Sequence, residues 1–111
     1  MRLTRESAIE WCIKHWTWVS EEEGRDKWGW PELPESVGGC FFCYYDYLRH
    51  KANDLYATDC KYCPYHKKFG HCAEEGKSYD LHRAAFRTYQ FDKAQQYAKD
   101  FLAQLKTLQI R

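Results

Sequence analysis

The sequence predicts a mainly α-helical domain, and three observations support this fold class. Apolar residues recur every three or four positions near both ends of the chain, which is the spacing of amphipathic helices. Between these ends lies a cysteine-rich segment with few aliphatic residues. The chain has 111 residues, of which 44% are hydrophobic, and this suffices for one core. We therefore expect residues 1–111 to form a single domain.

The first expected helix spans residues 4 to about 23. Thr4 is a suitable N-cap, and neither glycine nor proline follows until Gly24. One broad face of this helix is apolar and is expected to face the core, through Ala8, Ile9, Cys12, Ile13, Trp16 and Val19. Trp11 and Trp18 form a separate stripe. This stripe is either covered by a later segment or available as a partner-binding surface, because aromatic anchors are common in interfaces.

Residues 24–39 predict a loop that packs on the first helix. The segment contains four of the six glycines and two of the three prolines. Trp28 and Trp30 are expected to hold it against the domain, since an irregular segment with two tryptophans favours burial over free extension. It is not expected to be a flexible linker.

Residues 78–111 contain no glycine or proline and predict one or two closing helices. We favour two, with a break near residues 88–91. A continuous apolar stripe is expected to face the core, with a partner-helix seam as the alternative. The stripe consists of Phe91, Ala94, Tyr97, Ala98, Phe101, Leu102, Leu105 and Leu108.

The cysteine-rich segment predicts a zinc site between the helices. Cys40 and Cys43 form one C-x2-C pair, and Cys60 and Cys63 form a second after 16 intervening residues. This spacing is typical of a four-cysteine zinc site, because each pair presents two thiolates to one tetrahedral ion. We predict that Zn2+ binds these four cysteines and stabilises short helices or irregular turns around it.

Other ligand sets and cofactors remain open. Cys72 and His71 are alternate ligands, and His66 is either a further donor or an exposed polar residue. An iron–sulfur cluster accepts the same four thiolates and is the minor alternative to zinc. One chemically reasonable set consists of Cys40, Cys43, Cys63 and Cys72. Cys12 is instead expected to be a buried core residue.

The charge balance bears on the partner. Lys+Arg number 17 and Asp+Glu 16, so the formal net charge is +1. Four thiolates and one Zn2+ would change it to about −1, which disfavours a phosphate-binding surface. The alternative function is nucleic-acid binding through the basic, tyrosine-rich residues 44–68, with Lys67 and Lys68 as contacts. If the partner is a protein, the candidate binding residues are Trp11, Trp18, Lys67 and Lys68.

The sequence does not predict an enzyme. It contains no H-E-x-x-H, no H-x-E, no P-loop and no G-x-S-x-G. Two complete C-x2-C pairs would also fill a zinc shell and leave no position for water. The first residues carry charges without an apolar leader, and no stretch is as long as a membrane span. We therefore expect a cytoplasmic protein.

Several short segments resemble small, uncharacterised bacteriophage and prophage proteins. These segments are LTRESAIEWCIKHWTWV, CFFCYY, CKYCPY and GHC, followed by a closing helix. The resemblance implies a zinc-knuckle region of the form CxxC…CxxCP…C, a phage origin and a location in the host cytoplasm, but no activity. The expected function is a non-enzymatic, zinc-stabilised module that binds a host or phage protein, with its oligomeric state left open.

Overall fold

The computed structural model describes residues 3–34, 39–49, 63–72 and 74–108, and these ranges contain helices but no strand. The helices are α1 (Arg5–Glu21), the 3-10 helix η1 (Lys27–Gly29), α2 (Phe41–Arg49), α3 (Pro64–Phe69), α4 (Ser78–Arg87) and α5 (Phe91–Lys106). The predicted mainly α-helical fold class is confirmed. Within the same ranges, no helix combines the length and the apolar character that crossing a bilayer requires.

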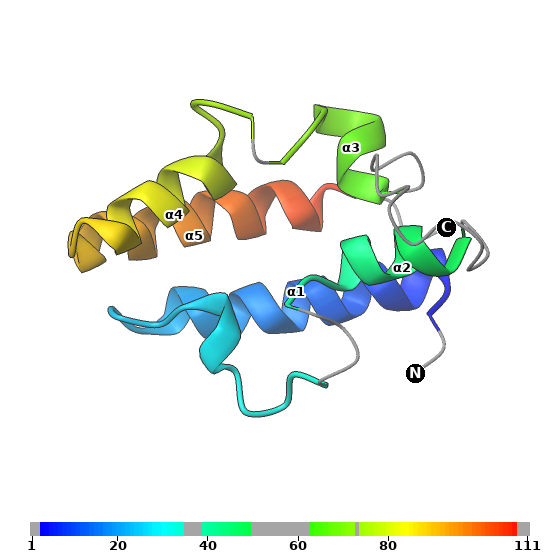
Figure 1. Cartoon of the computed structure of the whole chain (residues 1–111), viewed down its shortest axis with the longest axis horizontal. Coiled ribbons are helices and arrows are strands. Elements are labelled where there is room, and N and C mark those ends of the chain that lie inside the picture. The colour runs from blue at the N-terminus through cyan, green and yellow to red at the C-terminus, as the bar shows by residue number, and fades with distance from the viewer. Residues whose placement is uncertain (1–2, 35–38, 50–62, 73, 109–111) are drawn as a thin grey trace.

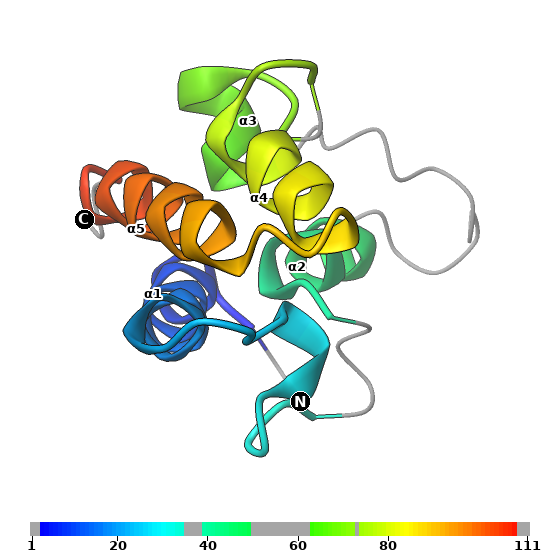
Figure 2. The same ribbon diagram turned by 90° about the vertical axis from the view of Figure 1, so that its left-hand side faces the viewer.

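Three helices form what we call the helical scaffold: α1, α4 and α5. In Figure 1, α4 and α5 run side by side in opposite directions, and α1 lies along the other side of α5. α2 packs against α1 (Figure 2), and α3 lies near the same end of the molecule in Figure 1. The two short helices thus flank one end of the scaffold.

α1 begins with a capping box at its predicted N-cap. The backbone N–H of Ser7 donates to Thr4 Oγ1 at 3.1 Å, and the Thr4 N–H donates to Ser7 Oγ at 2.9 Å. The predicted apolar face is turned inward, since Ala8, Ile9, Cys12, Trp16 and Val19 are buried and Ile13 is half-buried. The capping residues and the apolar period therefore fix both where α1 begins and how it is rotated.

The C-terminal part forms two helices, as we favoured from the sequence. α4 ends at Arg87, where Thr88 donates its backbone N–H to the Ala84 carbonyl at 3.2 Å. Tyr89 then adopts a φ of 60°, in the left-handed region, and α5 begins at Phe91. This turn lets α5 run back along α4.

The core centres on the apolar stripe of α5. The Trp16 ring of α1 meets Phe101 edge-to-face, with 4.8 Å between centroids. The buried members of the stripe are Ala94, Ala98, Phe101, Leu102, Leu105 and Leu108. The stripe thus faces the core in this structure, as expected from the sequence, and does not form an exposed seam for a partner helix.

Two fully buried histidines lie within the core. His82 on α4 donates from Nδ1 to the Ala94 carbonyl at 2.8 Å, and His15 on α1 donates from Nε2 to the Lys27 carbonyl at 2.6 Å. Burial lowers the pKa of both side chains from the ordinary value. Each neutral histidine therefore joins a helix to a neighbouring segment without a buried charge.

The segment after α1 folds back onto that helix through Trp30, as predicted, whereas Trp28 is 54% exposed and so is not buried as expected. Trp30 is buried and stacks on His15, with ring centroids 5.0 Å apart. Trp11 stacks on Phe41 of α2 at 5.5 Å, and the Arg25 guanidinium lies over the Trp18 ring at 4.4 Å. These contacts cover part of the tryptophan stripe of α1.

Candidate metal centre

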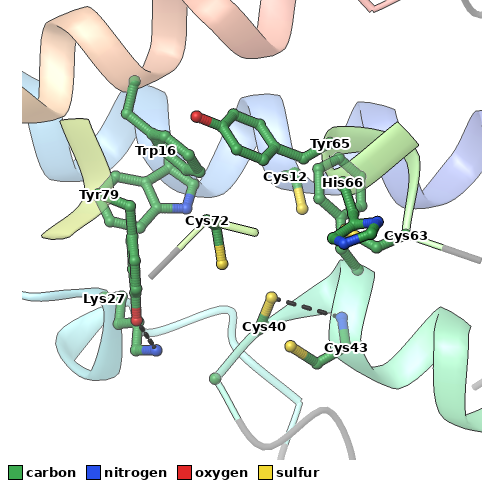
Figure 3. Close-up of a pocket in the computed structure, with 13 residues that line it drawn as sticks. Cys12, Trp16, Lys27, Cys40, Cys43, Cys63, Tyr65, His66, Cys72 and Tyr79 are labelled. Carbon is green, nitrogen blue, oxygen red and sulfur yellow. Dashed lines mark hydrogen bonds between the residues drawn. The ribbon is translucent and has the colours of Figure 1, made fainter. Parts of the chain in front are cut away.

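Five cysteine side chains from separate parts of the chain line one pocket. Cys12 belongs to α1, Cys40 and Cys43 to the start of α2, Cys63 to the start of α3, and Cys72 to the turn beyond α3. Figure 3 shows these side chains approaching a shared space from different sides. We call this feature the cysteine pocket.

Backbone geometry positions the first pair. Gly39 has a φ of 88°, and a Cβ atom there would lie 2.6 Å from the Trp28 ring, so glycine is required. Cys40 then accepts the Tyr44 N–H on its carbonyl at 3.0 Å, which starts α2. The Cys43 N–H donates to Cys40 Sγ at 3.4 Å. This amide-to-sulfur contact draws both cysteines into one turn.

α3 positions the other two thiols. Cys63 is its N-cap, and Pro64 follows in the first turn, where a backbone N–H is dispensable. The helix ends at Gly70, whose φ is 85° and whose N–H donates to the His66 carbonyl at 2.9 Å. The chain turns there, and Cys72 reaches the pocket two residues later. The short helix α3 thus presents Cys63 at its start and Cys72 just beyond its end.

The charges around the pocket distinguish Cys40 from Cys12. Cys40 accepts a hydrogen bond from the Cys43 side chain and lies near the Lys27 ammonium, and these contacts hold its pKa below the ordinary value despite burial. Burial raises the pKa of Cys12 well above its ordinary value. Cys40 is therefore suited to act as a thiolate ligand, whereas Cys12 is suited to remain a buried thiol.

Aromatic rings enclose the remaining wall of the pocket. They belong to Trp16, Phe42, Tyr65, Tyr79 and Phe101. Tyr65 is buried and donates its hydroxyl to Gln104 Oε1 at 2.8 Å. Burial, together with the nearby Cys72 and Cys63, raises its pKa to about 12. The pocket has a volume of about 60 Å3. Cysteine and aromatic side chains make up most of its lining.

The structure brings together three of the four predicted ligands, Cys40, Cys43 and Cys63. Cys60 lies outside the described residues. The alternate ligand Cys72 also lines the pocket. In the described part of the chain, no three Cys, His, Asp or Glu side chains are close enough together to hold a metal ion. The thiols therefore surround a common space without meeting at a single point.

The two candidate histidine ligands occupy different positions. His66 lines the pocket, whereas His71 is exposed, and their ring centroids are 6.3 Å apart. His66 is thus the better placed of the two as an additional donor.

Sequence reasoning did not identify Lys27 as part of this site. Lys27 lines the pocket, and its ammonium donates to the Tyr79 hydroxyl at 2.5 Å. No motif marks it, because its position depends on the fold of the loop around η1. The Gly-Gly-Cys sequence ending in Cys40 was an available signal for a tight approach at Gly39.

The predicted partner-binding residues differ in their exposure. Trp11 and Trp18 are half-buried, while Lys67 and Lys68 are exposed. Lys68 donates its ammonium to the Thr107 carbonyl at 3.0 Å and so contacts the end of α5. Tyr65 is buried, so this member of the basic, tyrosine-rich segment is not available to stack on a base.

Comparison with protein-family models, curated proteins and solved structures gives no match to this chain. The geometry itself defines a small helical domain with a thiol-lined pocket at one end of the scaffold.

Proposed function

We propose that the protein is a small, non-enzymatic, metal-stabilised interaction domain. The observation that carries this proposal is the convergence of Cys40, Cys43, Cys63 and Cys72 on one pocket. Thiolates are soft ligands that select zinc or iron–sulfur centres over magnesium and calcium. Among the residues that the structure describes, this set is the one that lines the pocket together with Cys12.

The proposed role of the centre is to join α2 and α3 to the scaffold. α3 has only six residues and α2 nine, so neither has the length at which an isolated helix is stable in water. Coordination by cysteines at both ends of α3 and the start of α2 would hold these helices in place. The metal would thereby contribute directly to the folding of this region.

A structural role agrees with the donor set. Four protein thiolates complete the coordination of a structural zinc and also ligate a cubane iron–sulfur cluster. A domain held in this way presents a fixed surface to another protein. The partner remains an expectation from the resemblance to phage proteins, namely a host or phage protein, and nucleic acid is the less favoured partner.

Metal content in purified protein tests the centre. We expect the wild type to contain metal, and Cys40→Ser, Cys43→Ser, Cys63→Ser and Cys72→Ser each to lose most of it. Cys12→Ser is the matched control, because Cys12 lines the same pocket and is buried but is not a proposed ligand. Equal metal content in all five variants and the wild type would contradict the proposal.

The interaction surface needs a separate test. Lys67 is an exposed candidate contact on α3, so Lys67→Glu should weaken partner capture while metal content stays unchanged. Titration with single-stranded and duplex oligonucleotides at two salt concentrations tests the other partner class. Salt-sensitive binding that Lys67→Glu abolishes would favour nucleic acid over protein.

A further inference from the structure

The size of the cysteine pocket bears on what the thiolates hold. In a four-cysteine zinc site each Zn–S bond is about 2.3 Å, so tetrahedral geometry puts the sulfurs about 3.8 Å apart, in mutual contact. Such a site leaves no cavity between its ligands. The cysteine pocket, in contrast, encloses about 60 Å3. A cavity needs only about 10–15 Å3 to hold one water molecule, so the pocket has room for a group of several atoms.

We infer that Cys40, Cys43, Cys63 and Cys72 hold a [4Fe–4S] cluster, whose core of iron and sulfide fills this pocket. The inference rests on the proposed thiolate centre and specifies its occupant. In a cubane cluster each thiolate ligates a different iron, so the four sulfurs lie around the core instead of meeting at one ion. Figure 3 shows the cysteine side chains entering the shared space from separate segments, with Cys40 and Cys43 close together on the α2 side.

The walls of the pocket suit a cluster. Five aromatic side chains line it, and an apolar shell limits solvent access to a metal site. Four thiolates and an oxidised cubane core carry a net charge of about −2. The Lys27 ammonium lies in the same wall and offsets part of this charge. Its contact with the Tyr79 hydroxyl holds it there.

The ligand set follows from position within the pocket. Cys40 and Cys43 begin α2, while Cys63 and Cys72 stand at the two ends of the α3 segment. Cys12 approaches from α1, on the core side, where it is buried. The four proposed ligands thus belong to the short helices, and the fifth thiol belongs to the scaffold.

The test is to purify the full chain without oxygen, or to reconstitute it with ferrous iron, sulfide and a thiol reductant. Iron, acid-labile sulfide and zinc are then measured together with the visible absorption spectrum. We expect about four irons and about four sulfides per chain, with the broad absorption of sulfide-to-iron charge transfer. Cys72→Ser should lose most of both, while Cys60→Ser, the control, should retain them.

Three results would overturn the inference, and they separate it from the proposed function. One zinc per chain without sulfide, lost in the cysteine variants, would exclude the cluster and leave the thiolate centre intact. If the protein is still free of metal after reconstitution, both the cluster and the proposed thiolate centre are excluded. Loss of iron in Cys60→Ser but not in Cys72→Ser would overturn this ligand set. If Cys72→Ser does not fold, the iron and sulfide content of the wild type still decides the question.

Discussion

α5 and α3 illustrate two ways in which this chain becomes ordered. α5 has 16 residues and buries five of them against its neighbours, whereas α3 has six residues and buries two. The long helix is stabilised by an apolar stripe that packs on α1 and α4. The short helix buries Pro64 and Tyr65 and has a cysteine near each end. The scaffold is thus held by packing, and the proposed metal centre would add coordination to the packing of α2 and α3.

The strongest test of the scaffold is Leu105→Ala. Leu105 is fully buried, so the substitution removes apolar contacts and leaves a cavity. We expect the free energy of unfolding to fall by about 2–5 kcal/mol, as measured by urea denaturation followed by circular dichroism. Lys106→Ala, at the exposed next residue, should change it by less than about 0.5 kcal/mol. Similar values for the two variants would show that α5 is not held by packing.

Removal of the metal tests the other half of the comparison. We expect a lower melting temperature and loss of amide-exchange protection in α2 and α3, while α1, α4 and α5 keep theirs, because the scaffold has its own apolar core. Hydrogen exchange of loaded and metal-free protein measures this directly. An unchanged melting temperature after verified removal would contradict a structural metal, and complete unfolding would contradict an independent scaffold.

Gly39→Ala separates backbone strain from contact with the pocket wall. An alanine at the positive φ of residue 39 should lower the free energy of unfolding by about 1–3 kcal/mol. The new Cβ would also overlap the Trp28 ring beside Cys40. Gly24→Ala is a matched control, because Gly24 has a φ of 80° but no atom within 4 Å of such a Cβ. Both variants should lose stability, but only Gly39→Ala should also bind metal more weakly in a competition titration with a chelator. Equal metal affinity would show that Gly39 does not position Cys40.

The smallest expected effect concerns pH and the buried histidines of the scaffold. Burial lowers the pKa of His82 and of His15 from 6.5, so below that pH the unfolded chain binds more protons than the folded one. Stability should therefore be complete above about pH 6.5 and decrease as the pH falls below it. Urea denaturation of metal-free protein at several pH values measures this slope without contributions from metal release. His82→Gln should flatten the slope, and an unchanged slope would exclude His82 as a source.

Much of the scaffold could be predicted from the sequence, because its signals are local. The capping residues at Thr4, the apolar period of α1 and the uninterrupted pattern after residue 78 all depend on neighbours in the chain. The same holds for the break between α4 and α5. These features follow from helix geometry and do not require knowledge of distant contacts.

The cysteine pocket could be predicted only in part. The spacing of Cys40 and Cys43 indicated two ligands in one turn, and the structure places both at the start of α2. Spacing alone could not show that Cys72 reaches the same pocket, because this depends on the turn at Gly70. It also could not place Lys27 or the aromatic wall, which come from the packing of separate segments. The choice of a metal remains a proposal.

The packing of α1 against α5 has a consequence for synthesis of the chain. Residues of α1 leave the ribosome roughly 70 or more residues before those of α5, so the main apolar contact of the scaffold cannot form until α5 has been synthesised. By then, Cys40, Cys43, Cys63 and Cys72 have all been synthesised and are not yet enclosed by Trp16 and Phe101. The thiols of the nascent chain are thus accessible to solvent before the aromatic wall closes over them, which is when the proposed metal centre would be loaded.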